Sequence, residues 1–403
     1  MNKSPSIMLV AGEPSGDYLG GRLMSALQED SPQGISFYGV GGGFMAAQGL
    51  NSLFSIQEIS VNGLQEVITR IPHLLRHIKQ VADFAIEKKP DLLVIIDSPD
   101  FTHRVARRVR RLAPEIPIVN YVPPTVWLWR KGRARRMRKY VDLILSLLPF
   151  EPRVFEQEKG PPCIYTGHPA VEVYMNGDQE RGRGFRQKYN ISDNETILLL
   201  APGSRYNEIQ RLNSVFERTL SLLSQRYPRL RPVVLATVSV EPQVRDLVSR
   251  WSVPHVLVIE NSEQVDLFRA SNVALAASGT ISLELALANV PTVIAYTAGV
   301  LTGVIVHSLH GTGFLNLEYA SLVNIALQRK IVPEHLAIRL NPKKISQSVL
   351  KLLTDDNKRN VVFQGFADFQ KLMSVTGSSP TQKAAGEIMG LLREKSKRTD
   401  LSV

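Results

Sequence analysis

The sequence is poor in cysteine and in long apolar runs. A single cysteine, Cys163, stands among 403 residues, which excludes an internal disulfide and any metal site built from several cysteines. Residues 290–306 are the most apolar later segment, but Gly299 and Gly303 interrupt them, and they fall short of the about 20 residues that span a bilayer. The N-terminus offers only Lys3 and a short apolar run, too little for a signal peptide. We therefore expect a protein of a reducing cytosol without a transmembrane helix.

Three common motifs for phosphate or divalent ions are also missing. The first strand leads into neither Gly-x-Gly-x-x-Gly nor a loop ending in Gly-Lys-Ser/Thr. No Asp-x-Asp pair suited to a divalent ion is present, and His307 and His310 lack nearby acidic or cysteine partners. We therefore predict no metal site and no cofactor, so that arginines, hydroxyls and backbone N–H groups must hold any anion.

Strand and helix patterns alternate along most of the chain, which predicts parallel sheets covered by helices on both faces. Hydrophobic residues make up 44% and charged residues 21% of the chain, as in a globular protein of two domains. Residues 176–184 are polar and glycine-bearing and form the best linker. We expect one α/β domain over 1–175, a second over 176–342, and C-terminal helices over 343–403 that cross back.

The loop over residues 9–21 organises the first domain. Apolar residues 7–11 predict a buried strand, and Ser15 or Asp17 is expected to cap a helix starting near Tyr18. Gly20 and Gly21 would weaken that helix, so they indicate close approach by a ligand or by backbone.

Carboxylates gather where the strands of the first domain end. Residues 91–96 form the clearest buried strand, and Asp97 follows it directly, where open α/β sheets bind their ligands. Glu13 and Asp17 repel phosphate and suit a hydroxyl-bearing acceptor, and glycines such as Gly16 leave room for it. The alternative for the acids near residue 97 is helix capping, which fits Asp100 at least as well.

The second domain has glycine-containing turns after two of its strands. Each turn presents backbone N–H groups and a hydroxyl at a helix start, an arrangement typical of anion sites. Arg205 adds a bidentate phosphate donor, and Glu284 is placed to accept from ribose hydroxyls. We predict a nucleotide diphosphate held by Gly203, Ser204, Arg205, Ser278, Gly279, Thr280 and Glu284.

Net charge is +11, and the first domain carries two arginine-rich clusters, over residues 104–111 and 130–139. Solvated helix faces are one interpretation, and a basic surface meeting nucleic acid or anionic lipid is the other. Residues 56–80 have amphipathic helix periodicity, which favours either packing on the sheet or insertion at a membrane interface. We expect a membrane-facing surface formed by Ile68, Leu74, Leu75, Trp127, Trp129 and Arg130.

These features together predict an inverting glycosyl transfer. A sugar nucleotide in the second domain would be attacked by an acceptor hydroxyl that a carboxylate of the first domain deprotonates. Arginine and helix N-termini can neutralise the departing nucleoside diphosphate without metal.

A set of short segments recurs in the order found in one family. The segments are residues 11–17 (AGEPSGD), 96–101 (IDSPDF), 126–130 (VWLWR), 148–151 (LPFE), 167–169 (GHP), 202–205 (PGSR) and 277–280 (ASGT). Together they closely resemble the lipid-A-disaccharide synthases over nearly the whole chain.

The resemblance implies a GT-B fold, in which two Rossmann-like domains face each other across a cleft. It implies that UDP-2,3-diacylglucosamine and 2,3-diacylglucosamine 1-phosphate are joined into the β-1,6 lipid A disaccharide 1-phosphate with release of UDP. By position, Asp97 is implied as the general base, Glu13 and Ser15 as acceptor-side residues, and Arg205, Ser278–Thr280 and Glu284 as the UDP site. Asn324 matches a family Pro-Asn segment, although Val323 replaces the proline. A peripheral enzyme at the cytoplasmic face of the inner membrane is also implied, as is a homodimer that exchanges its C-terminal segments.

Two alternatives to this function stay open from the sequence. One is another UDP-sugar enzyme of the same fold, either a UDP-GlcNAc epimerase or a different lipid-linked sugar transferase. The other is a nucleic-acid-binding protein, and against it the arginines lack a recognisable nucleic-acid module and the paired anion turns would be unexplained. We expect no nucleic-acid partner.

Overall fold

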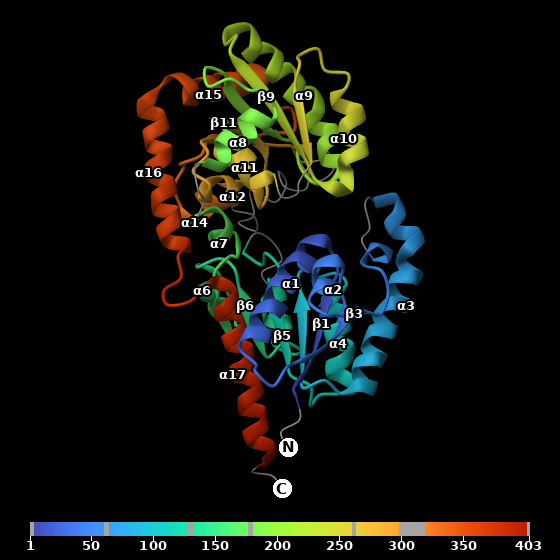
Figure 1. The fold of residues 1–403 in the computed structure, drawn as a ribbon. Coiled ribbons are helices and arrows are strands. Elements are labelled where there is room, and N and C mark those ends of the chain that lie inside the picture. Colours follow the sequence, from blue (N-terminus) through green and yellow to red (C-terminus); the bar gives the residue numbers. More distant parts are fainter. Residues whose placement is uncertain are drawn as a thin grey trace. The chain divides into compact units, whose positions relative to one another are not determined.

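The chain forms two compact α/β units in a computed structural model (Figure 1). The structure describes residues 4–59, 64–127, 132–175, 180–259, 263–297 and 319–400, with only the backbone of 64–71 and 396–400. Unit 1 comprises Met1–Pro169 and Val375–Val403, and unit 2 comprises Ala170–Ser374. No helix of the described residues is long and apolar enough to cross a membrane.

Unit 1 is built on a parallel sheet with the strand order β3-β2-β1-β4-β5-β6-β7. Its strands are β1 (Ser6–Ala11), β2 (Ser36–Val40), β3 (Asn51–Ser52), β4 (Leu92–Ile96), β5 (Ile118–Tyr121), β6 (Leu143–Ser146) and β7 (Cys163–Tyr165). Strands β1 and β4 are buried almost throughout, as expected for a sheet covered on both faces.

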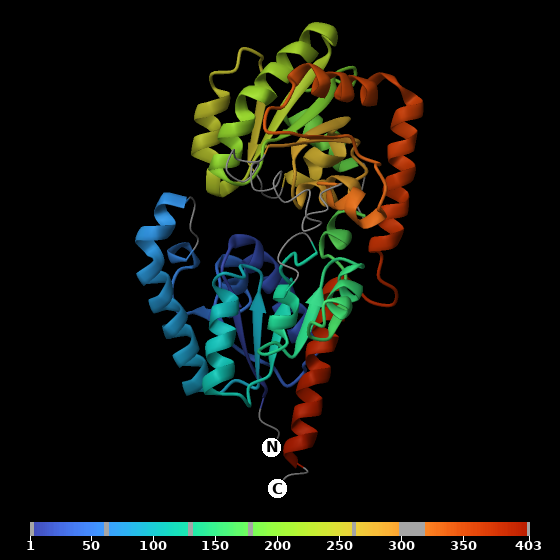
Figure 2. The ribbon, with the colours of Figure 1, turned by 180° about the vertical axis from the view of Figure 1, so that it is seen from behind.

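Helices cover both faces of this sheet. They are α1 (Pro14–Glu29), α2 (Gly43–Ala47), the short 3-10 helix η1 (Ile56–Glu58), α3 (Leu64–Lys88), α4 (Thr102–Leu112), α5 (Gly132–Met137), α6 (Glu151–Gln157) and α17 (Pro380–Asp400). Helix α1 contacts α17 over the face seen in Figure 1, and α3 contacts α4 on the face seen in Figure 2.

Unit 2 repeats the same plan with the strand order β10-β9-β8-β11-β12-β13, again parallel. Its strands are β8 (Thr196–Ala201), β9 (Leu230–Ala236), β10 (Val256–Ile259), β11 (Val273–Ala277), β12 (Thr292–Tyr296) and β13 (Glu334–Leu336). Its helices are α7 (Ala170–Tyr174), α8 (Glu180–Lys188), α9 (Tyr206–Arg226), η2 (Val238–Val240), α10 (Glu241–Val248), α11 (Gln264–Ala270), α12 (Ile281–Leu287), α14 (Leu322–Leu327), α15 (Pro342–Thr354) and α16 (Asp356–Met373).

Three expectations about helices change in the structure. Helix α1 begins at Pro14 rather than near Tyr18, because proline suits the first helical position and Glu13 takes the extended N-cap conformation. Helix α8 begins at Glu180, inside the expected linker, and packs against α11. In the helix expected over residues 56–80, the described residues form the separate 3-10 helix η1 over Ile56–Glu58 and the first part of α3 from Leu64.

The C-terminal helices divide between the two units. Helices α15 and α16 belong to unit 2, where α15 contacts α9 and α16 contacts α12. Only α17 belongs to unit 1, and its Ala384, Ala385 and Ile388 are fully buried in that unit's core. The expected return of residues 343–403 is therefore made by the last helix alone.

Candidate active site

Each sheet has one point where the strand order reverses direction. In unit 1 this point lies between β1 and β4, where Ala11 pairs with Ile96, so the loops beginning at Gly12 and Asp97 start side by side. In unit 2 it lies between β8 and β11, where Ala201 pairs with Ala276. Open α/β sheets bind ligands at such points. The predicted acidic loop and both predicted anion turns thus emerge at switch points.

Asp97 sits in a strained turn at the end of β4. Its φ is +49° and that of Ser98 is +41°, both in the left-handed region that non-glycine residues rarely adopt. The buried Thr102 hydroxyl donates to the carbonyl of Asp97 at 2.6 Å and lies 3.1 Å from that of Ser98. Such strain costs of the order of 1–3 kcal/mol per residue and is common at functional sites. The fold therefore holds this half-buried carboxylate on a backbone conformation that costs stability.

The loop after β1 packs closely against this turn. A Cβ atom at Gly12 would lie 2.4 Å from the Ser98 hydroxyl oxygen, so only glycine fits there. The exposed Ser15 donates from its hydroxyl to Oδ2 of Asp97 at 3.1 Å. The half-buried Glu13 occupies the N-cap of α1 in the same loop. The structure thus brings Ser15 and Asp97 together.

Asp17 does not face an acceptor. Its side chain is 4% exposed, and it accepts backbone hydrogen bonds from Gly42 at 2.7 Å, Phe44 at 3.1 Å and Met45 at 3.0 Å. These N–H groups belong to the start of α2, whose helix dipole favours a negative charge. Asp17 therefore holds the second glycine loop in place, and the expectation that it orients acceptor hydroxyls is corrected.

The glycines of α1 make room for protein rather than for a sugar. A Cβ atom at Gly21 would lie 2.8 Å from the carbonyl oxygen of Phe44, and one at Gly20 would lie 2.7 Å from the sulfur of Met45. At Gly16 the nearest atoms are the Cβ of Ala11 and the carbonyl oxygen of Ile96, both at 3.3 Å. Of the two alternatives, close approach by the chain itself is the one observed.

In unit 2 the first predicted anion turn is open to solvent. Ser204 and Arg205 are exposed, Gly203 has φ +120°, and Arg205 is the extended N-cap of α9. Glu208, for which the sequence predicted no role, also lies at this turn, and its Oε2 would lie 2.4 Å from a Cβ at Gly203. Burial raises the pKa of Glu208, while Arg205 and Arg211 act in the opposite direction. The sequence feature that could have identified Glu208 is its position three residues after Arg205, at the start of the same helix.

The second turn is tied to its surroundings through its hydroxyl. Ser278 donates to the carbonyl of Ala320 at 2.8 Å, while Gly279 and Thr280 are exposed and Gly279 has φ +157°. Glu284 accepts from the amide of the buried Gln264 at 3.0 Å. Gln264 orients that carboxylate, and nothing in its sequence context pointed to this.

Asn324 is fully buried, and its side chain forms hydrogen bonds with the backbone of nearby residues. Its amide nitrogen donates to the carbonyl of Val332 at 2.9 Å, and its oxygen accepts from the backbone of Ile331 at 2.8 Å and Val332 at 2.9 Å. A nucleotide could reach this side chain only if these bonds broke. The expected contact between the Asn324 side chain and UDP is therefore corrected to a structural role.

Trp127 points inward rather than outward. It is half-buried, its indole N–H donates to Oε1 of Glu151 at 3.3 Å, and its ring lies edge-on to Phe150. Glu151 is 2% exposed and also accepts from the backbone of Leu148 at 3.0 Å. Burial raises the pKa of Glu151 to about 7, although its hydrogen bonds act to lower it. Trp127 anchors its loop, which conflicts with the expectation that it faces a membrane.

The rest of the expected membrane-facing surface is only partly described. Leu75 of α3 is 48% exposed and Leu74 is half-buried against the core. The C-terminal half of α3 packs on its own sheet through Ile78, Val81, Ala82 and Ala85, so packing accounts for that half. The side chain of Ile68, together with Trp129, Arg130, His307 and His310, lies outside the described residues.

The two arginine clusters adjoin at His103. Arg107 of α4 and Arg133 of α5 both act on this histidine, and burial first, then these two cations, lower its pKa to about 3. Within the first cluster, Arg108 pairs with Asp83 and Arg110 with Asp142. Arg104, Arg107 and Arg111 remain exposed on α4. They lie along one helix face and define what we call the α4 basic face.

Solved structures with the same fold hold UDP-GlcNAc in one case and UDP in another. The UDP-GlcNAc 2-epimerase from Neisseria meningitidis bound to UDP-GlcNAc superposes with a TM-score of 0.64 at 15% identity, over 96% of this chain and 100% of that chain. A structure of S. aureus MnaA with UDP gives a TM-score of 0.61 at 15% identity, over 96% of this chain and 95% of that chain. At these identities the likeness concerns the fold alone. The fold is the two-domain α/β type called GT-B.

Sequence relatives give the family. Residues 7–388 match the family model described as lipid-A-disaccharide synthetase. The lipid-A-disaccharide synthase of Rhodospirillum centenum is 41% identical over 96% of this chain and 95% of its own length. That of Nitrobacter winogradskyi is 41% identical over 98% of each chain. The chain therefore belongs to the lipid-A-disaccharide synthetase family, and it is a glycosyltransferase of lipid A biosynthesis.

Proposed function

We propose that the chain transfers the sugar of UDP-2,3-diacylglucosamine to the 6-hydroxyl of 2,3-diacylglucosamine 1-phosphate, with inversion at the anomeric carbon. The observation that carries this proposal is the strained Asp97 turn at the switch point of unit 1, in a chain of this family. The test is a mass-spectrometric assay with both diacyl sugars, in which disaccharide 1-phosphate and UDP form in equal amounts. Release of UDP without disaccharide would argue against it.

Asp97 acts in this proposal as the general base. Its carboxylate accepts the proton of the attacking hydroxyl as the new glycosidic bond forms, for which heavy-atom distances of about 2.6–3.2 Å are needed. Ser15, already hydrogen-bonded to Oδ2, fixes the orientation of the carboxylate. Glu13, in the same loop, is proposed to contact the acceptor sugar.

The departing UDP is proposed to bind at the two turns of unit 2. As the bond from the anomeric carbon breaks, negative charge grows on the diphosphate, and the Arg205 guanidinium and nearby N–H groups stabilise it. The proposed diphosphate site is also lined by Gly203, Ser204, Gly279 and Thr280. Glu284 accepts hydrogen bonds from the ribose hydroxyls. The exposure of both turns supports the assignment.

Arg205→Gln should weaken UDP binding by roughly 10- to 100-fold, because a hydrogen bond to a charged group contributes about 1.5–3 kcal/mol. Isothermal titration with UDP measures the dissociation constant. Arg226→Gln is the matched control, since Arg226 is also exposed and lies on the last turn of α9. Equal affinity in the two variants would remove Arg205 from the UDP site.

The protein is further proposed to dock peripherally on the cytoplasmic face of the inner membrane, where both acylated substrates reside. The α4 basic face supports this, because each cation near an anionic surface contributes about 1 kcal/mol. Leu75 of α3, exposed beside Arg76 and Lys79, supplies an apolar contact.

The triple variant R104Q/R107Q/R111Q should bind phosphatidylglycerol vesicles on the order of 100-fold more weakly than the wild type. Vesicle co-sedimentation at fixed salt measures this. R183Q/R226Q/R229Q removes the same charge from exposed positions of unit 2 and should retain binding within about threefold. Equal losses in the two variants would show that net charge, and not the α4 basic face, governs binding.

A homodimer that exchanges α17 is the proposed assembly. Helix α17 fills a core position of unit 1 through a short connection from α16, so a second copy could supply the same helix. Sedimentation equilibrium should then give twice the 44.9 kDa mass of one chain, and a monomer at all concentrations would refute it.

A further inference from the structure

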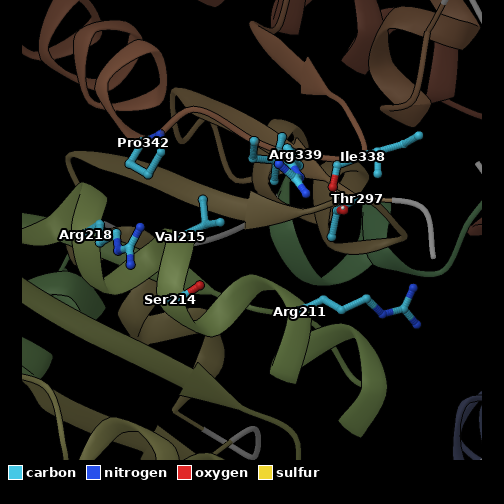
Figure 3. Close-up of a pocket in the computed structure, with 9 residues that line it drawn as sticks. Arg211, Ser214, Val215, Arg218, Thr297, Ile338, Arg339 and Pro342 are labelled. Carbon is cyan, nitrogen blue, oxygen red and sulfur yellow. Dashed lines mark hydrogen bonds between the residues drawn. The ribbon is translucent and has the colours of Figure 1, made fainter. Parts of the chain in front are cut away.

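A cavity in unit 2 gathers three arginines that the proposed nucleotide site does not use. It has a volume of about 270 Å³ and lies between α9 and the segment that follows β13 (Figure 3). Arg211, Ser214 and Arg218 of α9 line one side. Thr297 at the end of β12 and Arg339 after β13 line the other. Both guanidinium and hydroxyl donors therefore border one space.

The charges around this cavity are poorly balanced. Among the described residues, no ion pair joins Arg211, Arg218 or Arg339 to a carboxylate. The nearby acids are Glu208, on which Arg211 acts, and Glu217, which lines the adjoining cavity with Arg218.

The first turn of α15 adds to this excess of positive charge. It contains Lys343 and Lys344 and no acidic residue, although a helix N-terminus favours negative charge. Cations that gather without counter-ions raise the energy of the fold, and a bound anion would relieve this.

The walls of the cavity are firmly held. Helix α9 packs along α15, and the Thr297 hydroxyl donates to the carbonyl of Ile338 at 3.2 Å, which joins the ends of β12 and β13. Nε of Arg211 donates to the carbonyl of Asn207 at 2.8 Å, which turns that side chain away from Arg218 and Arg339 (Figure 3). A framework fixed in this way binds an anion with little loss of conformational entropy.

We propose that this cavity binds a phosphate group through Arg218 and Arg339, with the hydroxyl of Ser214 as a further donor. The volume is below the about 300–1,000 Å³ of pockets that enclose a whole small ligand, so the site takes the phosphate while the rest of the molecule stays outside. At 1.5 Å of rise per residue, Arg218 lies about 20 Å along α9 from Arg205, so the two sites are separate. The phosphate belongs either to a free anion or to a lipid headgroup.

The first arm of the test is a titration with inorganic pyrophosphate in saturating UDP, which occupies the proposed nucleotide site. We expect one equivalent to bind the wild type. R218Q/R339Q should weaken this binding by roughly tenfold or more, since two charged donors are lost. R226Q/R229Q removes the same charge from exposed positions outside the cavity and should stay within twofold.

The second arm adds phosphatidylglycerol vesicles to the same complexes. Release of pyrophosphate by vesicles, lost in R218Q/R339Q, supports a lipid headgroup, and retention supports a free phosphate compound. Absence of saturable binding in both arms, or equal affinities in the two double variants, would overturn the site. If the wild type does not bind UDP, the nucleotide proposal fails separately, and the two double variants still decide on the cavity.

Discussion

Asp97→Asn should lower the turnover number for disaccharide formation by about 10²- to 10⁴-fold, the usual contribution of a general base. UDP affinity should stay within about twofold, because the proposed nucleotide contacts are made in unit 2. Asparagine is a better probe than alanine here. It tolerates the left-handed backbone that Asp97 adopts, and its carbonyl can still accept from Ser15. The loss then reports the missing base rather than a collapsed turn.

Asp100→Asn is the matched control for this prediction. Asp100 is exposed and lies in the same loop, three residues beyond Asp97, and from the sequence alone helix capping fits it at least as well. In the structure the N-cap of α4 is Phe101, without a side-chain bond, so Asp100 carries no capping role. Its variant should keep near-normal turnover in the mass-spectrometric assay. Undiminished turnover in Asp97→Asn would sink the base assignment.

The sequence predicted the sheets well because apolar periodicity records burial directly. The strands expected over residues 7–11 and 91–96 are β1 and β4, each placed within about one residue. Since ligands of parallel sheets bind at strand ends, that accuracy was enough to place Asp97 at a strand end. The strand orders that make these ends switch points came only from the structure. The positions of Asp97, Gly203 and Gly279 follow from strands alone.

Polar partners were harder to predict, because nothing in a local pattern says where a side chain finds its hydrogen bonds. Asp17 was assigned to an acceptor, yet its bonds go to backbone groups of Gly42, Phe44 and Met45, far along the chain. The Asn324 side chain likewise accepts hydrogen bonds from the backbone of residues 331 and 332. The left-handed turn at Asp97 and Ser98 contains no glycine, the residue that usually indicates such a backbone in a sequence. Long-range contacts and strain of this kind appear only in the folded chain.

The second large effect concerns Glu151, the acid of the Leu-Pro-Phe-Glu segment, for which the sequence predicted no role. Burial raises its pKa from 4.5 to about 7. Between these values the native state binds one proton more than the unfolded state, so the free energy of unfolding falls as pH rises. At 1.36 kcal/mol per pKa unit, the stability present below pH 4.5 is reduced by about 3 kcal/mol above pH 7.

Glu151→Gln should remove this dependence. Glutamine stays neutral, so the difference in unfolding free energy between variant and wild type should shift in favour of the variant by about 2 kcal/mol between about pH 5.5 and 8. The amide accepts only through its oxygen, and losing one of the bonds from Trp127 and Leu148 adds a cost that does not vary with pH. Urea unfolding followed by circular dichroism at several pH values measures the shift.

Glu156→Gln provides the comparison, since Glu156 is exposed on the same helix α6. Buried histidines such as His103 have a low pKa, so acid lowers the free energy of unfolding through them. Their contribution is the same in all three proteins, and it cancels when the unfolding free energies are subtracted. Parallel stability profiles of wild type and Glu151→Gln would show that Glu151 ionises as an ordinary surface acid. If the profiles diverge, the indole of Trp127 is held by a carboxyl that changes charge near neutral pH.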